Sequence, residues 1–454
     1  MNILITGATG FIGQKISLQL IKDQHNLIVI GRSSEKQFRQ VFTFPCKYYS
    51  WEKLNTLQDD LNIDAVIHLA GASIAGGRWT HKRKKIILDS RVKTAKALFS
   101  YFNRINIYPK TFLSASAIGY YNFSQNEVFD EDSPKGDGFL ADVCKQWEDA
   151  SLDFEKNSRR ILLRFGLVFD PRDGFLKKMG PLFSTGLAGR IGPGKQWMSW
   201  VHIDDLVKAV LFCLKNNTIH GPVNVVSPQA CSNVEFTQTL SQTLKQTPFI
   251  PVPALALKLI LGEMAVLALG SQHVTPKKLS DHHFTFDYPD LKAALKELYA
   301  WHTLPYQQIF SDTQWFNHTV DKIFPFFCEA KNLEKITPPL LKFRVLNQST
   351  QSIEPGTLIN YKLKIHGIPT KWTTLIKAWQ KNTMFIDTQK KGPYKEWQHT
   401  HTFQSYPNGT LMLDDVIYRV PMGRLGLIMT GAWVLKDIIT IFKYRKIATQ
   451  NHLR

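Results

Sequence analysis

The start of the chain constrains its fold more than any other segment does. An apolar run, NILIT at residues 2–6, leads directly into TGATGFIG, in which glycines stand at positions 7, 10 and 13. Isoleucine or leucine then recurs at positions 12, 16 and 20, as on one face of a helix. A glycine turn between a strand and a helix lets the backbone approach a pyrophosphate, which the helix N-terminus attracts. We therefore predict a dinucleotide-binding loop formed by Thr6, Gly7, Thr9, Gly10, Phe11, Ile12 and Gly13.

The segments that follow predict the sheet to which this loop belongs. The apolar runs NLIVIG, DAVIHLAG, TFLSAS and RILLRFG alternate with helical stretches. Continuous apolar strands separated by helices are typical of a parallel sheet that helices cover on both faces. We predict a Rossmann-type, doubly wound α/β domain over residues 1–305.

The sequence pattern changes near residue 305. Beyond it come a short helical segment near residues 320–327, alternating strands rich in aromatic and β-branched residues, and a hairpin signal at Asn408-Gly409. An amphipathic stretch from about Leu425 to Lys446 follows. Because 454 residues are enough for two or three domains, we predict a second domain over residues 306–454, in which an antiparallel sheet holds the C-terminal helix.

Composition limits the classes of binding partner and the cellular compartment that we expect for this protein. The formal net charge of +19 would attract anionic partners, but the chain has no nucleic-acid-binding motif and its basic residues are spread over alternating strand positions. No basic segment precedes the first apolar run, and no run of about 18 apolar residues is uninterrupted. The five cysteines are scattered, without a C-x-x-C pair. We expect a cytoplasmic protein with reduced thiols and a small-molecule partner, without a metal ion, nucleic acid or membrane contact.

The end of the second predicted strand indicates which dinucleotide is bound. An NAD-binding domain usually has Asp or Glu there, to bind the ribose hydroxyls. This chain has Arg32 and Ser33 instead, which suit a 2′-phosphate. The sequence therefore favours NADP over NAD.

Several motifs together resemble the extended short-chain dehydrogenase/reductases, in particular the atypical epimerase-family proteins of the NAD-dependent epimerase/dehydratase type. These motifs are the glycine loop, DAVIHLAG, LAGASIAGGRWT, SASAIGYY, FLADVCKQWE, GPGKQWMSWVHIDDL and a subgroup-specific segment at about 250–300. The resemblance implies cofactor contacts at Leu69, Ala70 and Gly71 and substrate contacts at Arg78, Trp79, Arg91, Gln196, Trp197 and His202. Core packing is the alternative role for both tryptophans, and a local hydrogen bond is the alternative for His202.

The resemblance also reveals a gap in the catalytic residues. Ordinary members use a Tyr-x-x-x-Lys pair, in which the lysine lowers the pKa of the tyrosine so that the phenol can exchange a proton with the substrate. Aligned on Glu148, the two positions hold Leu140 and Cys144, which cannot do this. The candidate substitutes are Ser116, with Ser114 as its alternative, Tyr120 and Tyr121.

The stretch from about residue 306 to 450 resembles a START-like, or SRPBCC, helix-grip domain. The resemblance rests on FPFFCEAKNLEKITPPLLKFRVL, GTLINYKLKIHGIPTKWTTLIKAW, GPYKEWQHTHTF and YPNGTLMLDDVIYRV. It implies a curved sheet around a long helix, with an apolar cavity for a hydrophobic ligand. Trp397, His399, His401 and Phe403 alternate onto one strand face. Because no third metal ligand is evident, we interpret the histidines as cavity lining or a cross-strand pair.

Two functions remain open at this point. The first is an NADP-dependent oxidoreductase or epimerase-like enzyme, acting on a hydrophobic small molecule that the C-terminal domain binds or delivers. The second is a non-catalytic, NADP(H)-responsive ligand-binding protein. The missing Tyr-Lys pair favours the second function, whereas the retained serines and substrate-side residues favour the first.

Overall fold

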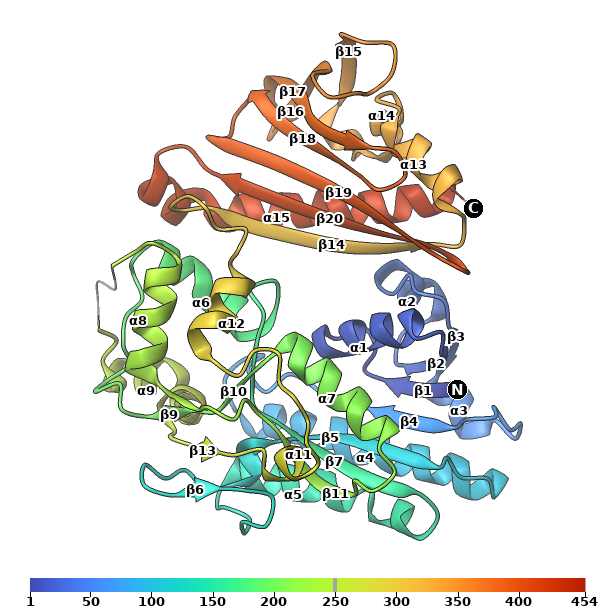
Figure 1. The fold of residues 1–454 in the computed structure, drawn as a ribbon, viewed down its shortest axis with the longest axis vertical. Coiled ribbons are helices and arrows are strands. Elements are labelled where there is room, and N and C mark those ends of the chain that lie inside the picture. Colours follow the sequence, from blue (N-terminus) through green and yellow to red (C-terminus); the bar gives the residue numbers. More distant parts are fainter. Residues whose placement is uncertain (248–250, 454) are drawn as a thin grey trace. The chain divides into compact units, whose positions relative to one another are not determined.

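The computed structural model describes residues 1–247 and 251–453, which form two compact units (Figure 1). The first unit comprises Met1–Phe38 and Cys46–Ala300, and the second comprises Arg39–Pro45 and Trp301–Arg454. The division thus falls at Ala300 instead of residue 305. The short segment Arg39–Pro45, which we expected in the first domain, belongs to the second unit.

A parallel sheet forms the centre of the first unit, as the sequence predicts. Its strands lie in the order β11 (Gly221–Val225), β7 (Arg159–Phe165), β5 (Thr111–Ala117), β4 (Ala65–His68), β1 (Asn2–Thr6), β2 (Asn26–Gly31) and β3 (Lys47–Ser50). Every neighbouring pair is parallel. The strand order reverses beside β1, and ligands of such sheets bind at the carboxyl ends of the strands near this switch point.

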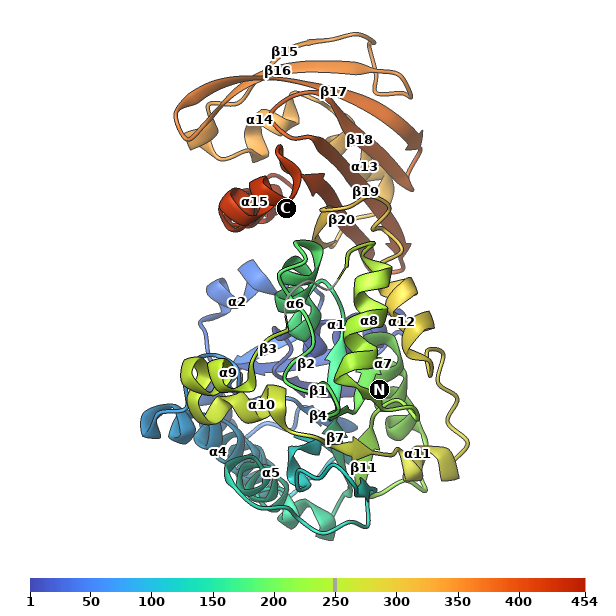
Figure 2. The ribbon, with the colours of Figure 1, turned by 90° about the vertical axis from the view of Figure 1, so that its left-hand side faces the viewer.

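Helices cover both faces of this sheet (Figures 1 and 2). On one face α1 (Phe11–Lys22) packs beside α7 (Ile203–Lys215), and on the other α4 (His81–Ile105) packs beside α3 (Trp51–Thr56) and α5 (Phe139–Asp149). Leu4, Val66 and Phe112 of the strands meet Leu98 and Phe102 of α4 in a core cluster, all nearly inaccessible to solvent. Burial on both faces explains why these strands read as continuous apolar runs.

Further helices and short strands occur before residue 300. The helices are α2 (Glu35–Val41), α6 (Gly174–Ser184), α8 (Asn233–Thr243), α9 (Ala254–Leu261), α10 (Val266–Leu269), α11 (Lys277–Asp281) and α12 (Leu291–Leu298). The short strands are β6 (Val128–Phe129), β8 (Leu167–Phe169), β9 (Trp197–Met198), β10 (Trp200–His202), β12 (Cys231–Ser232) and β13 (His273–Val274).

An antiparallel sheet forms the second unit, again as predicted. Its order is β14 (Gln308–Phe316), β20 (Gly409–Arg419), β19 (Glu396–Tyr406), β18 (Met384–Lys391), β17 (Ile368–Gln380), β16 (Leu358–Ile365) and β15 (Arg344–Gln348). The sheet is curved, and α13 (Val320–Cys328), α14 (Asn332–Ile336) and α15 (Gly423–His452) lie on its concave side (Figure 2). Phe324 of α13 packs on Phe403, while Phe442 of α15 packs with Val416.

The hairpin between β19 and β20 turns one residue earlier than the sequence suggests. Tyr406 pairs with Gly409, so Pro407 and Asn408 form the two-residue loop. Gly409 has φ +153° and lies against β14, where a Cβ would come within 2.2 Å of the Phe316 carbonyl oxygen. The glycine is therefore required for the close approach of β14, and does not serve as a turn centre.

Helix α15 corrects the expectation that no segment could span a membrane. Over an 18-residue window it has a mean hydropathy of 1.6, so by length and composition alone it is apolar enough to cross a bilayer. The same test is passed by core helices of soluble proteins, and 28% of this window is buried within the structure. Leu427, Ile438 and Phe442 of α15 belong to the apolar core of the second unit.

The carboxylate of Asp205 holds the backbone of the segment that precedes α12, and replacing it tests this role. This carboxylate, 1% exposed, accepts hydrogen bonds from the backbone N–H groups of Asp287 at 2.7 Å and Tyr288 at 2.9 Å. Asp205→Ala would leave both donors unpaired, so we expect the free energy of unfolding in urea to fall by about 3 kcal/mol. The adjacent Asp204, with a side chain 60% exposed, is the matched control, and Asp204→Ala should cost less than about 1 kcal/mol. Equal losses in the two variants would contradict this role.

Candidate nucleotide site and neighbouring polar network

The loop between β1 and α1 leaves no room for side chains. Gly7 has φ +73°, and a Cβ there would lie 2.7 Å from the Leu69 carbonyl oxygen. A Cβ at Gly13 would lie 2.2 Å from the Gly7 carbonyl oxygen. Gly10 caps α1 without a side-chain hydrogen bond, so the first N–H groups of the helix, beginning at Phe11 and Ile12, lack intrahelical acceptors. This geometry fits a pyrophosphate at the positive end of the helix.

The segment after β4 is fixed against the same loop. Leu69 donates its N–H to the Thr6 carbonyl at 3.1 Å, and Ala70 donates to the Thr6 hydroxyl at 3.2 Å. The Thr6 hydroxyl also pairs with His68 Nδ1 at 2.7 Å. Burial lowers the pKa of His68 to about 3, so its ring is neutral at physiological pH. The structure thus brings Thr6, Gly7 and the 69–71 segment together. The Thr9 carbonyl accepts a hydrogen bond from Gln14 Nε2 at 3.0 Å.

Arg32 and Ser33 follow the carboxyl end of β2, next to the glycine loop. Arg32 is exposed, and the Ser33 carbonyl accepts a hydrogen bond from the Tyr48 hydroxyl at 2.5 Å. The Tyr48 ring stacks on Phe38 with centroids 4.0 Å apart, which fixes this turn. The residue that follows β2 is therefore a cation, with no carboxylate at that position.

A buried charge network surrounds the candidate residues Ser116 and Tyr121. Arg164 on β7 makes two hydrogen bonds to Glu148 on α5, Nε to Oε1 at 2.8 Å and Nη2 to Oε2 at 2.9 Å. Both side chains are at most 7% exposed. Ser116 donates its hydroxyl to Glu148 Oε1 at 2.7 Å and is 2% exposed, whereas Ser114 donates to the Ala115 carbonyl. The ion pair raises the pKa of Arg164, which stays charged.

The two candidate phenols differ in their surroundings. Tyr121 is 1% exposed, donates its hydroxyl to Asn224 Oδ1 at 2.7 Å, and accepts a hydrogen bond from Arg164 Nη1 at 2.8 Å. Burial raises the pKa of Tyr121, so its phenol stays protonated. Tyr120 ends the short 3-10 helix Ile118–Tyr120 and is half-buried, with its ring 3.5 Å from the Arg164 guanidinium carbon.

The positions that hold the ordinary Tyr-Lys pair are filled by apolar contacts. A Cβ at Gly119 would lie 3.4 Å from Leu140 Cβ and 3.8 Å from Cys144 Sγ. Burial, together with the nearby Glu148 charge, raises the pKa of the Cys144 thiol to about 12. Cys144 is therefore a protonated, buried thiol and no nucleophile.

Arg78, Trp79 and Arg91, expected around the substrate, are engaged with the protein itself. Arg78 donates from Nε to the Ile260 carbonyl at 2.9 Å. The Trp79 indole N–H donates to the Ile74 carbonyl at 2.9 Å, and its ring meets Phe139 edge-on. Arg91 is 9% exposed, donates to the Ala72 and Ile87 carbonyls, and lies over the Trp147 ring.

The second expected substrate group, Gln196, Trp197 and His202, is also hydrogen-bonded internally. Gln196 donates to the Ala268 carbonyl at 3.3 Å and Trp197 donates its backbone N–H to Ser271 Oγ at 3.0 Å. His202 caps α7, accepting from the Asp204 N–H at Nδ1, and contacts Glu297 at 2.9 Å through Nε2. His202 therefore makes the local hydrogen bond that the sequence left as its alternative role.

Sequence reasoning missed the central cation of the network, Arg164. A charged residue inside the otherwise apolar strand RILLRFG was the available signal, since a buried charge requires a partner. Glu148 is the partner of Arg164, but in the sequence it only aligns the chain with the Tyr-x-x-x-Lys pattern. Asn224 accepts the hydrogen bond of the Tyr121 hydroxyl and so completes the network. It lies on a different strand, β11, and no feature of the sequence indicates its role.

The second unit contains a cavity of about 380 Å³ between its sheet and its helices. Apolar side chains such as Phe327, Leu333, Ile376 and Ile441 form most of its lining. His399 and His401 line it too, as predicted, and so does Arg445 of α15. The Nε and Nη1 atoms of Arg445 are buried and have no hydrogen-bond partner in the part of the chain that the structure describes.

Comparison with known proteins identifies the family to which the first unit is similar. Residues 3–226 match the model of the NAD dependent epimerase/dehydratase family, and residues 252–298 match a domain of unknown function, DUF1731. The chain is 36% identical over 307 residues to the chloroplastic epimerase family protein SDR39U1 homolog of Arabidopsis thaliana, covering 66% of this chain and 86% of the relative. An epimerase family protein of Staphylococcus saprophyticus is 35% identical over 299 residues, which cover 65% of this chain and 99% of the relative.

A solved structure shows the same relationship. The crystal structure of human epimerase family protein SDR39U1 (isoform2) with NADPH superimposes with a TM-score of 0.61 at 30% identity, covering 66% of this chain and 99% of the human one. The two family models thus cover the glycine loop, the parallel sheet and the segment that Asp205 holds. On these grounds the chain belongs to the NAD dependent epimerase/dehydratase family.

Proposed function

We propose that the first unit binds NADP(H) and acts as an oxidoreductase or epimerase-like enzyme on a small molecule. The observation that carries this proposal is the glycine loop, where the backbone of α1 approaches Gly7 too closely for any side chain at position 13. The exposed Arg32 at the end of β2 supports NADP over NAD. The human relative crystallised with NADPH adds further support.

In this proposal Tyr120 holds the proton that the substrate exchanges. When bound, the nicotinamide supplies a site that donates or accepts hydride. The Tyr120 ring rests on the Arg164 guanidinium, and this cation–π contact holds the phenol beside the ion pair. Arg164 acts as a positioning residue because Glu148 fixes its orientation. Tyr121 and Ser116 hold the frame around Tyr120, since their hydroxyl groups are already bonded to Asn224 and Glu148.

A non-catalytic, NADP(H)-responsive ligand-binding protein is the second candidate function. It is favoured by the apolar environment of Leu140 and Cys144 and by the internal bond of the Ser116 hydroxyl to Glu148. In this alternative the first unit responds to the bound cofactor without catalysing a reaction, and the second unit holds the ligand.

For the second unit we propose a START-like, helix-grip role in binding a hydrophobic molecule that carries an anionic group. The apolar lining would bury the body of such a ligand. The unpaired N–H groups of Arg445 would receive its anionic group, because a buried guanidinium gains most from a charged acceptor. Tethering to the first unit would raise the effective concentration of a delivered substrate.

Replacing Arg32 tests the choice of cofactor. Arg32→Ala should weaken NADPH binding at least tenfold, measured by fluorescence titration, and leave NADH binding within about twofold, because only NADPH has a 2′-phosphate. Lys36→Ala, an exposed cation on the same segment, is the control and should change neither affinity. Equal losses of NADPH and NADH binding in Arg32→Ala would remove the assignment of NADP.

A pair of phenylalanine variants tests the assignment of the proton donor. Tyr120→Phe should slow NADPH oxidation with a panel of carbonyl compounds by about 100-fold or more while NADPH binding is retained. Tyr121→Phe should keep the turnover rate but lower the free energy of unfolding by about 1–2 kcal/mol, because its two hydrogen bonds are lost. Full turnover in Tyr120→Phe would exclude its role. Tight NADPH binding by the wild type without turnover on any compound would shift the balance to the second candidate function.

Binding of anilinonaphthalene sulfonate, a hydrophobic anion, tests the cavity. Arg445→Gln should weaken its binding about tenfold, because one charged hydrogen-bond donor is lost. Ile376→Trp should abolish binding by filling the cavity, whereas Arg344→Gln, at an exposed position of β15, should have no effect. Unchanged dye binding in Ile376→Trp would place the dye outside the cavity.

A further inference from the structure

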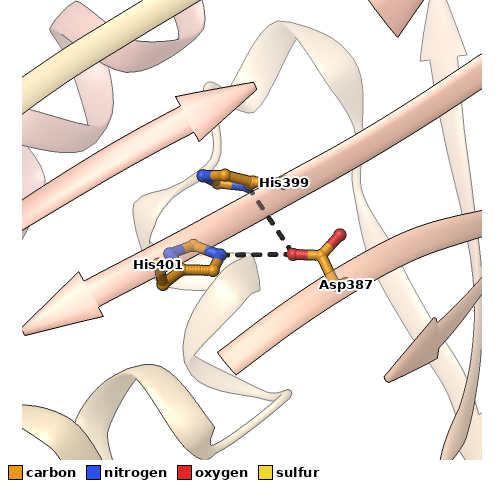
Figure 3. Close-up of side chains that lie close together, drawn as sticks. All are labelled: Asp387, His399 and His401. Carbon is orange, nitrogen blue, oxygen red and sulfur yellow. Dashed lines mark hydrogen bonds and ion pairs between the residues drawn. The ribbon is translucent and has the colours of Figure 1, made fainter. Parts of the chain in front are cut away.

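A cluster of two histidines and two aspartates interrupts the apolar concave face of the second unit's sheet. Asp387 on β18 pairs directly with His399 on β19, and Asp414 on β20 pairs directly with His401. The side chains of both histidines are 5% exposed and that of Asp414 is 8% exposed. Figure 3 shows both imidazole rings beside the Asp387 carboxylate. Asp387 is the third candidate ligand that the sequence did not reveal, because it lies on a neighbouring strand.

Asp414 contacts one nitrogen of each ring. Its Oδ1 lies 2.8 Å from His399 Nε2 in a hydrogen bond, and 2.8 Å from His401 Nδ1 in an ion-pair contact without hydrogen-bond alignment. The other nitrogens, His399 Nδ1 and His401 Nε2, are thereby left on the side of Asp387. A carboxylate behind an imidazole is the usual arrangement that orients a metal-binding histidine.

The distances from Asp387 to the two facing nitrogens are close to those between ligands around one small ion. Asp387 Oδ2 lies 3.6 Å from His399 Nδ1 and 3.2 Å from His401 Nε2. With metal–ligand bonds of about 2.0–2.1 Å and tetrahedral angles, two ligand atoms stand about 3.3 Å apart. All three ligand atoms lie within 4.8 Å of one another. The side chains therefore surround a position that an ion could occupy with little rearrangement.

The cluster also has an open side. Asp387, His399 and His401 line the cavity, whereas Asp414 lies behind the rings and does not. Two imidazoles and one carboxylate suit Zn²⁺ or another divalent transition ion better than Ca²⁺ or Mg²⁺, which prefer oxygen ligands throughout. Three protein ligands would leave a further coordination position, and all three line the cavity.

We propose that Asp387, His399 and His401 form a binding site for one divalent transition-metal ion, with Asp414 as the positioning residue. The open coordination position would let the ion contact a molecule held in the cavity. This site does not depend on cofactor binding or turnover in the first unit.

Titration of the chelator-treated full chain with Co²⁺ tests this proposal. The wild type should bind one Co²⁺ per chain with visible ligand-field absorption, and Zn²⁺ should displace it. Asp387→Asn and His401→Gln should each weaken binding at least tenfold, and Asp414→Asn by about 10- to 100-fold. His366→Gln, at an exposed histidine that pairs with Asp437, is the matched control and should leave binding unchanged.

The proposal is overturned if the wild type shows no stoichiometric Co²⁺ absorption. It is equally overturned if Asp387→Asn and His401→Gln bind as the wild type does, or if binding is lost in His366→Gln. Circular dichroism identifies any variant that fails to fold. In that case the wild-type absorption and the displacement by Zn²⁺ decide the question.

Discussion

The close approach between the start of α1 and the Gly7 carbonyl determines the geometry of the first unit. A Cβ at Gly13 would come within 2.2 Å of that oxygen, and one at Gly7 within 2.7 Å of the Leu69 carbonyl oxygen. The loop is thus enclosed by a helix on one side and the segment after β4 on the other. Backbone packing alone therefore directs the first N–H groups of α1 toward the carboxyl ends of the strands. The phosphate cradle needs no charged side chain of its own.

A second constraint is the buried ion pair between Glu148 and Arg164, which links α5 to β7. Removing one partner of such a pair leaves an uncompensated buried charge, which costs several kcal/mol. The hydroxyl groups of Ser116 and Tyr121 satisfy the remaining hydrogen bonds of the pair. The hydroxyl groups of Ser116 and Tyr121 are thus engaged in this network, and Tyr120 is the half-buried phenol beside it.

Local periodicity predicted the architecture well. The strand runs, the helix after the glycine loop and the antiparallel sheet were all predicted, because each depends on residues a few positions apart. The turn at Pro407-Asn408 was misplaced by one residue, because the requirement for Gly409 comes from Phe316 on a distant strand. The partner of Arg164 and the position of Asp387 beside His399 likewise depend on pairings between separate elements. No local sequence pattern indicates these contacts, because they join residues that are far apart along the chain.

The strand order of the second unit has a consequence for the time course of its folding. Strands β15 to β20 pair in sequential order, but β14 pairs along its whole length with β20. During synthesis, β14 therefore has no partner until β20 has left the ribosome, and the wall formed by α15 is added later still. Neither a ligand nor an ion can be enclosed before then. Until then the aromatic side chains of β18 and β19 lack their cover, and only the complete unit encloses the cavity.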